Sequence, residues 1–213
     1  MKTVTRTAET SSKPFEPGTT GWTASDLDDP AIEREWFRGR YEIVEGVLTK
    51  MAAAYFSGGE SLFTLMVLTR EHVKKHGPRG SFAGEVDIII DGPRVAVADA
   101  VFLTPEQRVL QAEASRRAGK TDPNRTRILI PPLLIIESVS PGHEAHDHRT
   151  KRRWYAEFGV PNYWLLDAYR RSLDCLVLDG GEYRVDQAET GEAEIRPSLF
   201  PGLVIPLREL WQS

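Results

Sequence analysis

Residues 131–167 decide the fold that the sequence predicts, and they read PPLLIIESVSPGHEAHDHRTKRRWYAEFGVPNYWLLD. The apolar run LLII ends in a carboxylate at Glu137, and a Ser-Pro turn follows it. The next segment, residues 145–158, predicts a helix, because Gly159 directly behind it is a common helix stop. A second apolar run, YWLL, comes after the helix. The stretch therefore predicts a strand, a helix and a second strand.

Two ionisable residues in this stretch occupy costly positions. Glu137 ends a run that is apolar on both faces, which is typical of a central strand. Lys151 shares one stripe of the predicted helix with Tyr155. Asp147 joins that stripe one turn earlier and could pair with the lysine or help to build the site. A charged group on a buried element costs free energy unless it is paired or bound to a metal ion. We therefore interpret Glu137 and Lys151 as candidates for a chemical role.

A second carboxylate lies upstream in the predicted strand VAVADAVFL. Strand alternation places Asp99 on one face together with Val97 and Val101. Two carboxylates and a lysine on adjacent core elements suit metal-assisted phosphodiester hydrolysis, in which the acids hold a divalent cation and the lysine orients water or neutralises phosphate charge. Taken singly, each acid could instead cap a turn, and the lysine could extend its ammonium group to water.

The composition limits the class of protein. The chain has 213 residues, of which 40% are apolar and 27% charged, and this balance predicts a folded, soluble protein. The net charge of −4 gives no global basic field of the kind that attracts nucleic acid. The single cysteine, Cys175, excludes an internal disulfide and predicts a reducing, cytoplasmic compartment. Its alternating apolar surroundings predict that it packs in the core. We expect no membrane span, because no apolar run is long enough.

The order of the elements predicts a mixed α/β (α+β) fold. We expect residues 1–20 to form a flexible leader and residues 21–213 to form a single domain. Periodicity and turn residues predict helices over 31–38, 61–76 and part of 104–127, a hairpin over 40–51 with its turn at Glu45-Gly46, and strands over 82–90, 95–103, 128–139, 162–167, 173–178 and 182–185.

The segment from Trp22 to Val185 resembles the Uma-type family of restriction-endonuclease-like proteins, a branch of the PD-(D/E)XK nuclease superfamily. The similar blocks are RYEIVEGVL, ADAVFLTPE, LLIIESVSPG, KRRWYAEFGVPNYWLLD and GEYRV. The resemblance implies a central mixed β-sheet flanked by helices, with an N-terminal β-hairpin and a C-terminal strand meander. It also implies a Mg²⁺ or Mn²⁺ site at a sheet edge, DNA as substrate, and catalytic roles for Asp99, Glu137 and Lys151.

The chain departs from the family pattern at several positions. Ala98 stands where the superfamily name places proline, and Val139 stands where that name places lysine. The lysine comes instead from the following helix, as is usual in this branch. The segment AAAYFSGGES at 52–61 lacks the histidine and prolines often found there in similar proteins. Glu42 matches a frequent family acid and is a further site candidate, or it pairs with Arg40.

Basic residues beside the lysine could contact phosphates. Arg149, Arg152 and Arg153 form one cluster, and residues 104–127 hold a second local excess of positive charge. A solvated helix face and loop explain both clusters equally well. The histidine-rich run HEAHDH at 143–148 fits no familiar zinc-ligand spacing, so we do not predict a zinc site.

Two functions follow from these observations. We favour a Mg²⁺-dependent endonuclease that cleaves DNA through Asp99, Glu137 and Lys151. The alternative is a catalytically inactive protein of nuclease fold that acts as a nucleic-acid-binding or protein-interaction module. Its motivation is the acidic net charge and the altered segment at 52–61. A homodimer is expected only by analogy with other folds that cut phosphodiesters.

Overall fold

The structure is a computed structural model that describes residues 13–51, 56–120, 127–139 and 146–211. Its internal contacts divide the chain into two compact units. Unit 1 holds the residues up to Ala52 together with Asp91–Ala96, and unit 2 holds Ala53–Ile90 and Val97–Ser213. The single domain predicted over residues 21–213 stays a prediction. No helix among the described residues is both long and apolar enough to cross a membrane.

Unit 1 is built around a short hairpin, as the sequence predicts. Strand β1 pairs antiparallel with β2, and Glu45 and Gly46 form the turn with φ of 48° and 79°. The side chain of Asp29 caps α1 by accepting from the Ala31 amide. The elements of this unit are η1 (Ala24–Asp28), α1 (Pro30–Arg38), β1 (Tyr41–Val44) and β2 (Val47–Lys50).

Residues 13–20, which the sequence analysis assigns to a flexible leader, pack against this hairpin. The Gly18 amide donates to the Leu48 carbonyl at 2.8 Å, and Thr20 forms a bridge to Val47. Residues 1–12, the rest of the predicted leader, lie outside the described residues.

Unit 2 carries a mixed sheet, which confirms the mixed α/β class. Strands β4 and β5 pair antiparallel, β5 and β6 pair parallel, and β6, β7 and β8 continue antiparallel, while β3 pairs with β4. The unit's elements are α2 (Phe56–His76), β3 (Ser81–Ile89), β4 (Val95–Leu103, whose first two residues belong to unit 1), α3 (Pro105–Arg117), β5 (Leu134–Ser138), η3 (His146–Lys151), α4 (Arg152–Phe158), β6 (Asn162–Asp167), β7 (Ser172–Asp179), β8 (Glu182–Thr190), β9 (Glu194–Ile195), β10 (Ile205–Pro206) and η4 (Leu207–Trp211).

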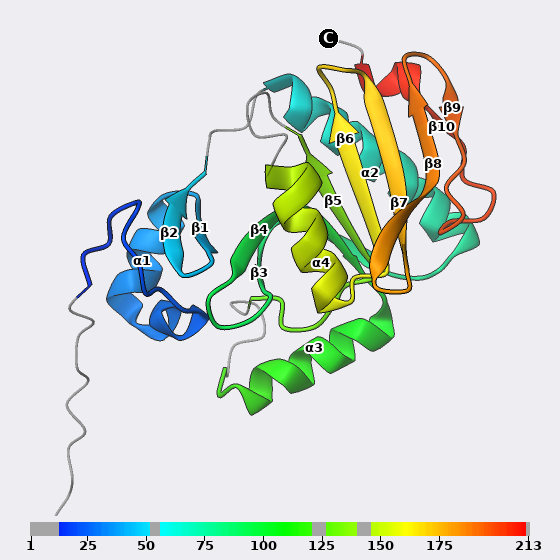
Figure 1. Cartoon of the computed structure of the whole chain (residues 1–213). Helices are drawn as coiled ribbons and strands as arrows, with labels where there is room; N and C mark the ends of the chain where they lie inside the picture. Colours follow the sequence, from blue (N-terminus) through cyan, green and yellow to red (C-terminus); the bar gives the residue numbers. More distant parts are fainter. Residues whose placement is uncertain (1–12, 52–55, 121–126, 140–145, 212–213) are drawn as a thin grey trace, which may run out of the picture. The chain divides into compact units, whose positions relative to one another are not determined.

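Helices α2 and α4 cover opposite faces of the sheet in unit 2 (Figure 1). Side chains alternate between the two faces along each strand. On the α2 face, Leu65 and Phe102 join a buried cluster with Ile136 and Trp164. The same cluster includes Cys175, which is 1% exposed, so the prediction that this cysteine packs in the core is confirmed. Burial raises the pKa of its thiol.

On the α4 face, aromatic rings and ionisable groups share the space under the helix. The rings of Tyr155 on α4 and Tyr163 on β6 meet edge to face with centroids 5.3 Å apart. Tyr163 lies beside Ile135, and the next residue of β5 on this face is Glu137. The register of the sheet therefore directs Glu137 toward α4.

Among the predicted elements of unit 2, α2 begins earlier (Phe56) and β8 ends later (Thr190) than expected, and two other elements are shorter than expected. The strand predicted over 128–139 is confined to Leu134–Ser138, because Pro131 and Pro132 cannot donate to a ladder. The helix predicted over 145–158 is α-helical only over Arg152–Phe158, and the preceding turn, His146–Lys151, is a π-helix. The predicted stop at Gly159 is confirmed, since this residue takes the left-handed conformation with φ of 87°.

Gly159→Ala should destabilise the protein by about 1–2 kcal/mol, because an alanine at this left-handed position brings its Cβ close to the backbone. Gly59→Ala is the matched control. Gly59 lies within α2 with open space around its Cα, so alanine there should stabilise by about 0.5–1 kcal/mol. Urea unfolding measures both values. Equal effects of the two substitutions would contradict the assigned helix end.

Candidate functional site

Asp99 and Glu137 come from neighbouring strands and share one face of the sheet. Ala100 of β4 lies opposite Ile136 of β5 at the end of the paired register, and Asp99 and Glu137 are the next residues of the two strands beyond that pair. The backbone amide of Ser138, the residue after Glu137, donates to Asp99 Oδ2 at 2.8 Å.

Glu137 is buried, with 1% of its surface exposed, and two side chains of the helical segment above it hold its carboxylate. Lys151 Nζ lies 3.2 Å from Glu137 Oε1. The hydroxyl of Tyr155 donates to the same oxygen at 2.6 Å. The sequence analysis predicted that Lys151 and Tyr155 share one helical stripe. In the structure both side chains contact the same carboxylate oxygen, Glu137 Oε1.

Lys151 is as deeply buried as Glu137, with 1% of its surface exposed. It is the last residue of the π-helical turn and the first before α4. Its ammonium group also donates to the main-chain carbonyl of Val97 in β4 at 2.9 Å. Lys151 thus links β4 and β5 from above the sheet, and its charge is compensated by one carboxylate and one backbone dipole.

The energetics of this cluster explain why burial is tolerated. A buried ion pair is close to neutral for stability when hydrogen bonds satisfy its remaining groups, but it becomes strongly destabilising when one partner is lost. Here the Tyr155 hydroxyl and the Val97 carbonyl supply those additional hydrogen bonds. The cluster is therefore a preorganised arrangement of charge inside the core.

Asp99 differs from Glu137 in its access to solvent. It is half-buried, whereas its strand neighbours Ala98 and Ala100 are fully buried. The site thus combines a partly exposed carboxylate, Asp99, with a buried carboxylate, Glu137. This arrangement would let a bound ion touch both solvent and the buried charge pair.

The other predicted site residues are distributed differently. Glu42 lies on β1 in unit 1, where it is buried. Asp147 belongs to the π-helical turn, but its side chain lies outside the described residues. Arg149 is exposed. Arg152 donates to the carbonyl of Tyr183 at 2.6 Å.

Arg153, the third member of the predicted basic cluster, forms an ion pair with Glu157 on α4 at 3.7 Å. Both side chains are more than 40% exposed, so this pair contributes little to stability. Of the three arginines, Arg149 is the one with no ion pair or hydrogen bond to the described residues. Residues 143–145 of the histidine-rich run lie outside the described residues.

Sequence reasoning missed two backbone groups and one ion pair. The Val97 carbonyl and the Ser138 amide carry no signal in residue type, because every residue of a strand offers the same groups. Arg127, 8% exposed, pairs with Asp87 of β3 at 3.1 Å. The sequence analysis placed Arg127 in a basic segment that either contacts phosphates or is solvated, but the structure buries it inside unit 2.

Within the described ranges, no cluster of three or more histidine, cysteine, aspartate or glutamate residues could hold a metal ion by itself. Asp99 and Glu137 supply two carboxylates, which are the hard oxygen donors that Mg²⁺ prefers. Magnesium usually keeps several water ligands and takes only one or two carboxylates from the protein. The donor set therefore fits Mg²⁺ better than zinc, which favours closed sites with nitrogen and sulfur ligands.

The fold is similar to that of a solved structure. The computed structure matches a crystal structure described as "a putative nuclease belonging to DUF820" from Anabaena variabilis, with a TM-score of 0.61 and 16% sequence identity. The match covers 82% of this chain and 90% of that chain. Comparison with curated proteins gives no match.

The chain belongs to the Uma2 family, whose description is "Putative restriction endonuclease" and whose model matches residues 34–208. The family predicted from the sequence blocks is thereby confirmed. The matched range includes Asp99, Glu137 and Lys151.

Removing one member of the buried pair should destabilise the protein strongly. We expect Lys151→Met or Glu137→Leu alone to cost about 3–5 kcal/mol, because each leaves a buried charge without its ion-pair partner. The double variant should be more stable than the sum of the single effects predicts. Chemical denaturation of all four proteins in this cycle measures the coupling. Additive effects would show that the two groups do not interact in solution.

Proposed function

We propose that this protein is a metal-dependent endonuclease that hydrolyses phosphodiester bonds in DNA, with a restriction-endonuclease-like core. The observation that supports the proposal is the buried contact of Lys151 Nζ with Glu137 Oε1 at 3.2 Å, beside the strand that carries Asp99. It is supported by the membership of the chain in the Uma2 family. The site residues and the substrate belong to the proposal.

In this proposal Asp99 and Glu137 hold one Mg²⁺ or Mn²⁺ ion. When bound, the ion would polarise the phosphate and lower the pKa of a water molecule, which is the chemistry that phosphodiester hydrolysis requires. Asp99 is the more exposed of the two carboxylates, so it would be the one nearer to the substrate. The Ser138 amide orients this carboxylate through Oδ2.

Lys151 would supply fixed positive charge beside the reacting phosphate. Its ammonium group is held by the Val97 carbonyl and by Glu137, so it requires no reorganisation when charge develops. Tyr155 acts as a positioning residue, because its hydroxyl holds Glu137 rather than facing a substrate. Arg149, exposed on the turn that carries Lys151, would contact the DNA backbone.

The decisive test is plasmid nicking with Mg²⁺ or Mn²⁺. Asp99→Asn, Glu137→Gln and Lys151→Met keep side-chain volume nearly constant, and each should lower the nicking rate by at least about 100-fold, since each removes an electrostatic contribution to the transition state. Asp179→Asn is the control, because Asp179 is 60% exposed at the end of β7 and pairs with Arg184. Chelation of the metal ion should stop the wild-type reaction. Cleavage at the wild-type rate by all three site variants would refute the proposal.

Tyr155→Phe separates positioning from catalysis. We expect it to lower the nicking rate less than Glu137→Gln and to shift the divalent-metal concentration needed for half-maximal rate upward. The reason is that Glu137 loses the hydrogen bond that fixes its orientation. Metal titrations of the nicking rate measure this shift. An unchanged metal requirement would show that Tyr155 serves stability alone.

The extreme burial of the charge pair favours a second candidate function. Glu137 and Lys151 are each 1% exposed, and they already compensate each other. An inactive member of the family, acting as a nucleic-acid-binding or protein-interaction module, would keep such a pair for structure alone. DNA binding without cleavage in the presence of any divalent ion would support this second candidate. A homodimer, proposed by analogy alone, is tested by the mass of the protein in solution.

A further inference from the structure

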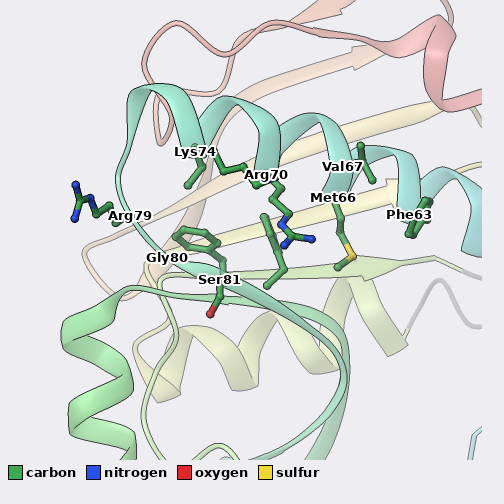
Figure 2. Close-up of a pocket in the computed structure, with 11 residues that line it drawn as sticks. Phe63, Met66, Val67, Arg70, Lys74, Arg79, Gly80 and Ser81 are labelled. Carbon is green, nitrogen blue, oxygen red and sulfur yellow. The ribbon is translucent and has the colours of Figure 1, made fainter.

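Unit 2 contains an apolar groove on the sheet face opposite the candidate site. It has a volume of about 430 Å³ and lies between α2 and the start of β3 (Figure 2). Phe63 and Val67, one helical turn apart on α2, stand on its wall with 69% and 41% of their surfaces exposed. The remaining apolar lining comes from Met66, Val73, Phe82 and Phe102. Exposed apolar groups gathered around a hollow commonly mark an interaction site.

Three cationic side chains line the same groove, and no carboxylate does. They are Arg70, Lys74 and Arg79. In Figure 2, Arg70 extends from α2 toward the strand beside Met66, whereas Arg79 directs its guanidinium group outward at the far end. Arg70 and Arg79 form no ion pair with any described residue.

The charge on this side of α2 is positive although the whole chain carries a net charge of −4. Lys74 holds the pKa of Glu71 below its ordinary value through a hydrogen bond, and the charge of Arg70 acts in the same direction. Arg108 of α3 adds a fourth cation near the groove by donating to Ser81 Oγ at 3.3 Å. The groove therefore complements an apolar occupant that carries negative charge.

The sheet separates this groove from the candidate active site. Phe102, which lines the groove, and Asp99 are three residues apart on β4 and point to opposite faces. A substrate at Asp99 and Glu137 would contact the α4 face, whereas the groove opens on the α2 face. The groove is therefore a surface separate from the candidate active site.

We propose that this groove binds an acidic amphipathic helix of a partner protein. The stretch of α2 from Phe63 to Lys74 extends roughly 16 Å at a rise of 1.5 Å per residue, which matches about three turns of a docked helix. Its apolar side chains would cover Phe63, Val67 and Met66. Its carboxylates would pair with Arg70 and Arg79, whose planar guanidinium groups bind carboxylates bidentately.

The lining favours a peptide over a nucleic acid. Met66, Val67 and Val73 are aliphatic, and a nucleobase gains little from stacking on them compared with flat aromatic rings. Phe82 packs against Phe102 with ring centroids 5.0 Å apart, so its ring is already engaged, and Phe63 is the one strongly exposed ring among the lining residues. Irregular aliphatic surfaces with flexible methionine suit apolar side chains.

The test uses the full chain and a fluorescein-labelled peptide of roughly 14 residues, with leucine and phenylalanine at helical i, i+3, i+4 and i+7 spacing and glutamate elsewhere. Fluorescence anisotropy compares it with a twin in which lysine replaces every glutamate, and with a labelled oligothymidylate. We expect the acidic peptide to bind at least about tenfold more tightly than either probe, a difference of about 1.4 kcal/mol.

Arg70→Glu and Phe63→Ala should each weaken binding of the acidic peptide by at least about tenfold, as expected for central interface residues. Both positions are exposed, so the variants should fold, and thermal unfolding checks this. Arg184→Glu on β8 is the matched charge-reversal control and should leave binding unchanged.

Glu137→Gln should also leave peptide binding unchanged, which separates this proposal from the nuclease proposal. Several results would overturn it: equal affinity for the acidic and basic peptides, tighter binding of the oligothymidylate, no binding of the acidic peptide up to about 1 mM, or unchanged affinity of Arg70→Glu.

Discussion

The buried contact between Glu137 and Lys151 is the constraint on which the site in unit 2 depends. Neither charge could remain at 1% exposure without the other. Satisfying both requires a strand that carries the acid, a helical turn that brings the lysine over it, and a neighbouring strand whose Val97 carbonyl accepts a hydrogen bond from the ammonium group. The same requirement fixes where β4, β5 and α4 meet. The contact between Glu137 and Lys151 therefore both holds these elements together and forms part of the candidate site.

The two faces of the sheet in unit 2 differ in the chemical character of their buried side chains. Under α4, the interior holds ionisable groups whose hydrogen bonds are specific and directional. Under α2, the interior is a large apolar cluster that contributes stability through burial. Because side chains alternate along a strand, β4 and β5 can supply both environments from consecutive residues. The apolar groove belongs to the second face, where the α2 residues Phe63 and Val67 remain exposed to solvent.

Elements that end at a characteristic turn or helix-stop residue were predictable from sequence. The turn at Glu45-Gly46 and the stop at Gly159 follow from the backbone freedom of glycine. Helix α3 was only partly foreseen, although Thr104 and Gln107 form a capping box at its start. The π-helical turn before Lys151 was not foreseen, because its hydrogen-bond spacing depends on how the segment meets the sheet rather than on residue type.

The sequence by itself determined the family, the mixed α/β class, and which acids and lysine lie on core elements, because apolar periodicity and short motifs are local properties. Only the tertiary structure decided that Tyr155 and Lys151 share one oxygen of Glu137, and that backbone groups of Val97 and Ser138 complete the cluster. Only it placed Arg127 in a buried pair with Asp87. These contacts join residues distant in the chain, and strand register, which no single segment encodes, sets their distances.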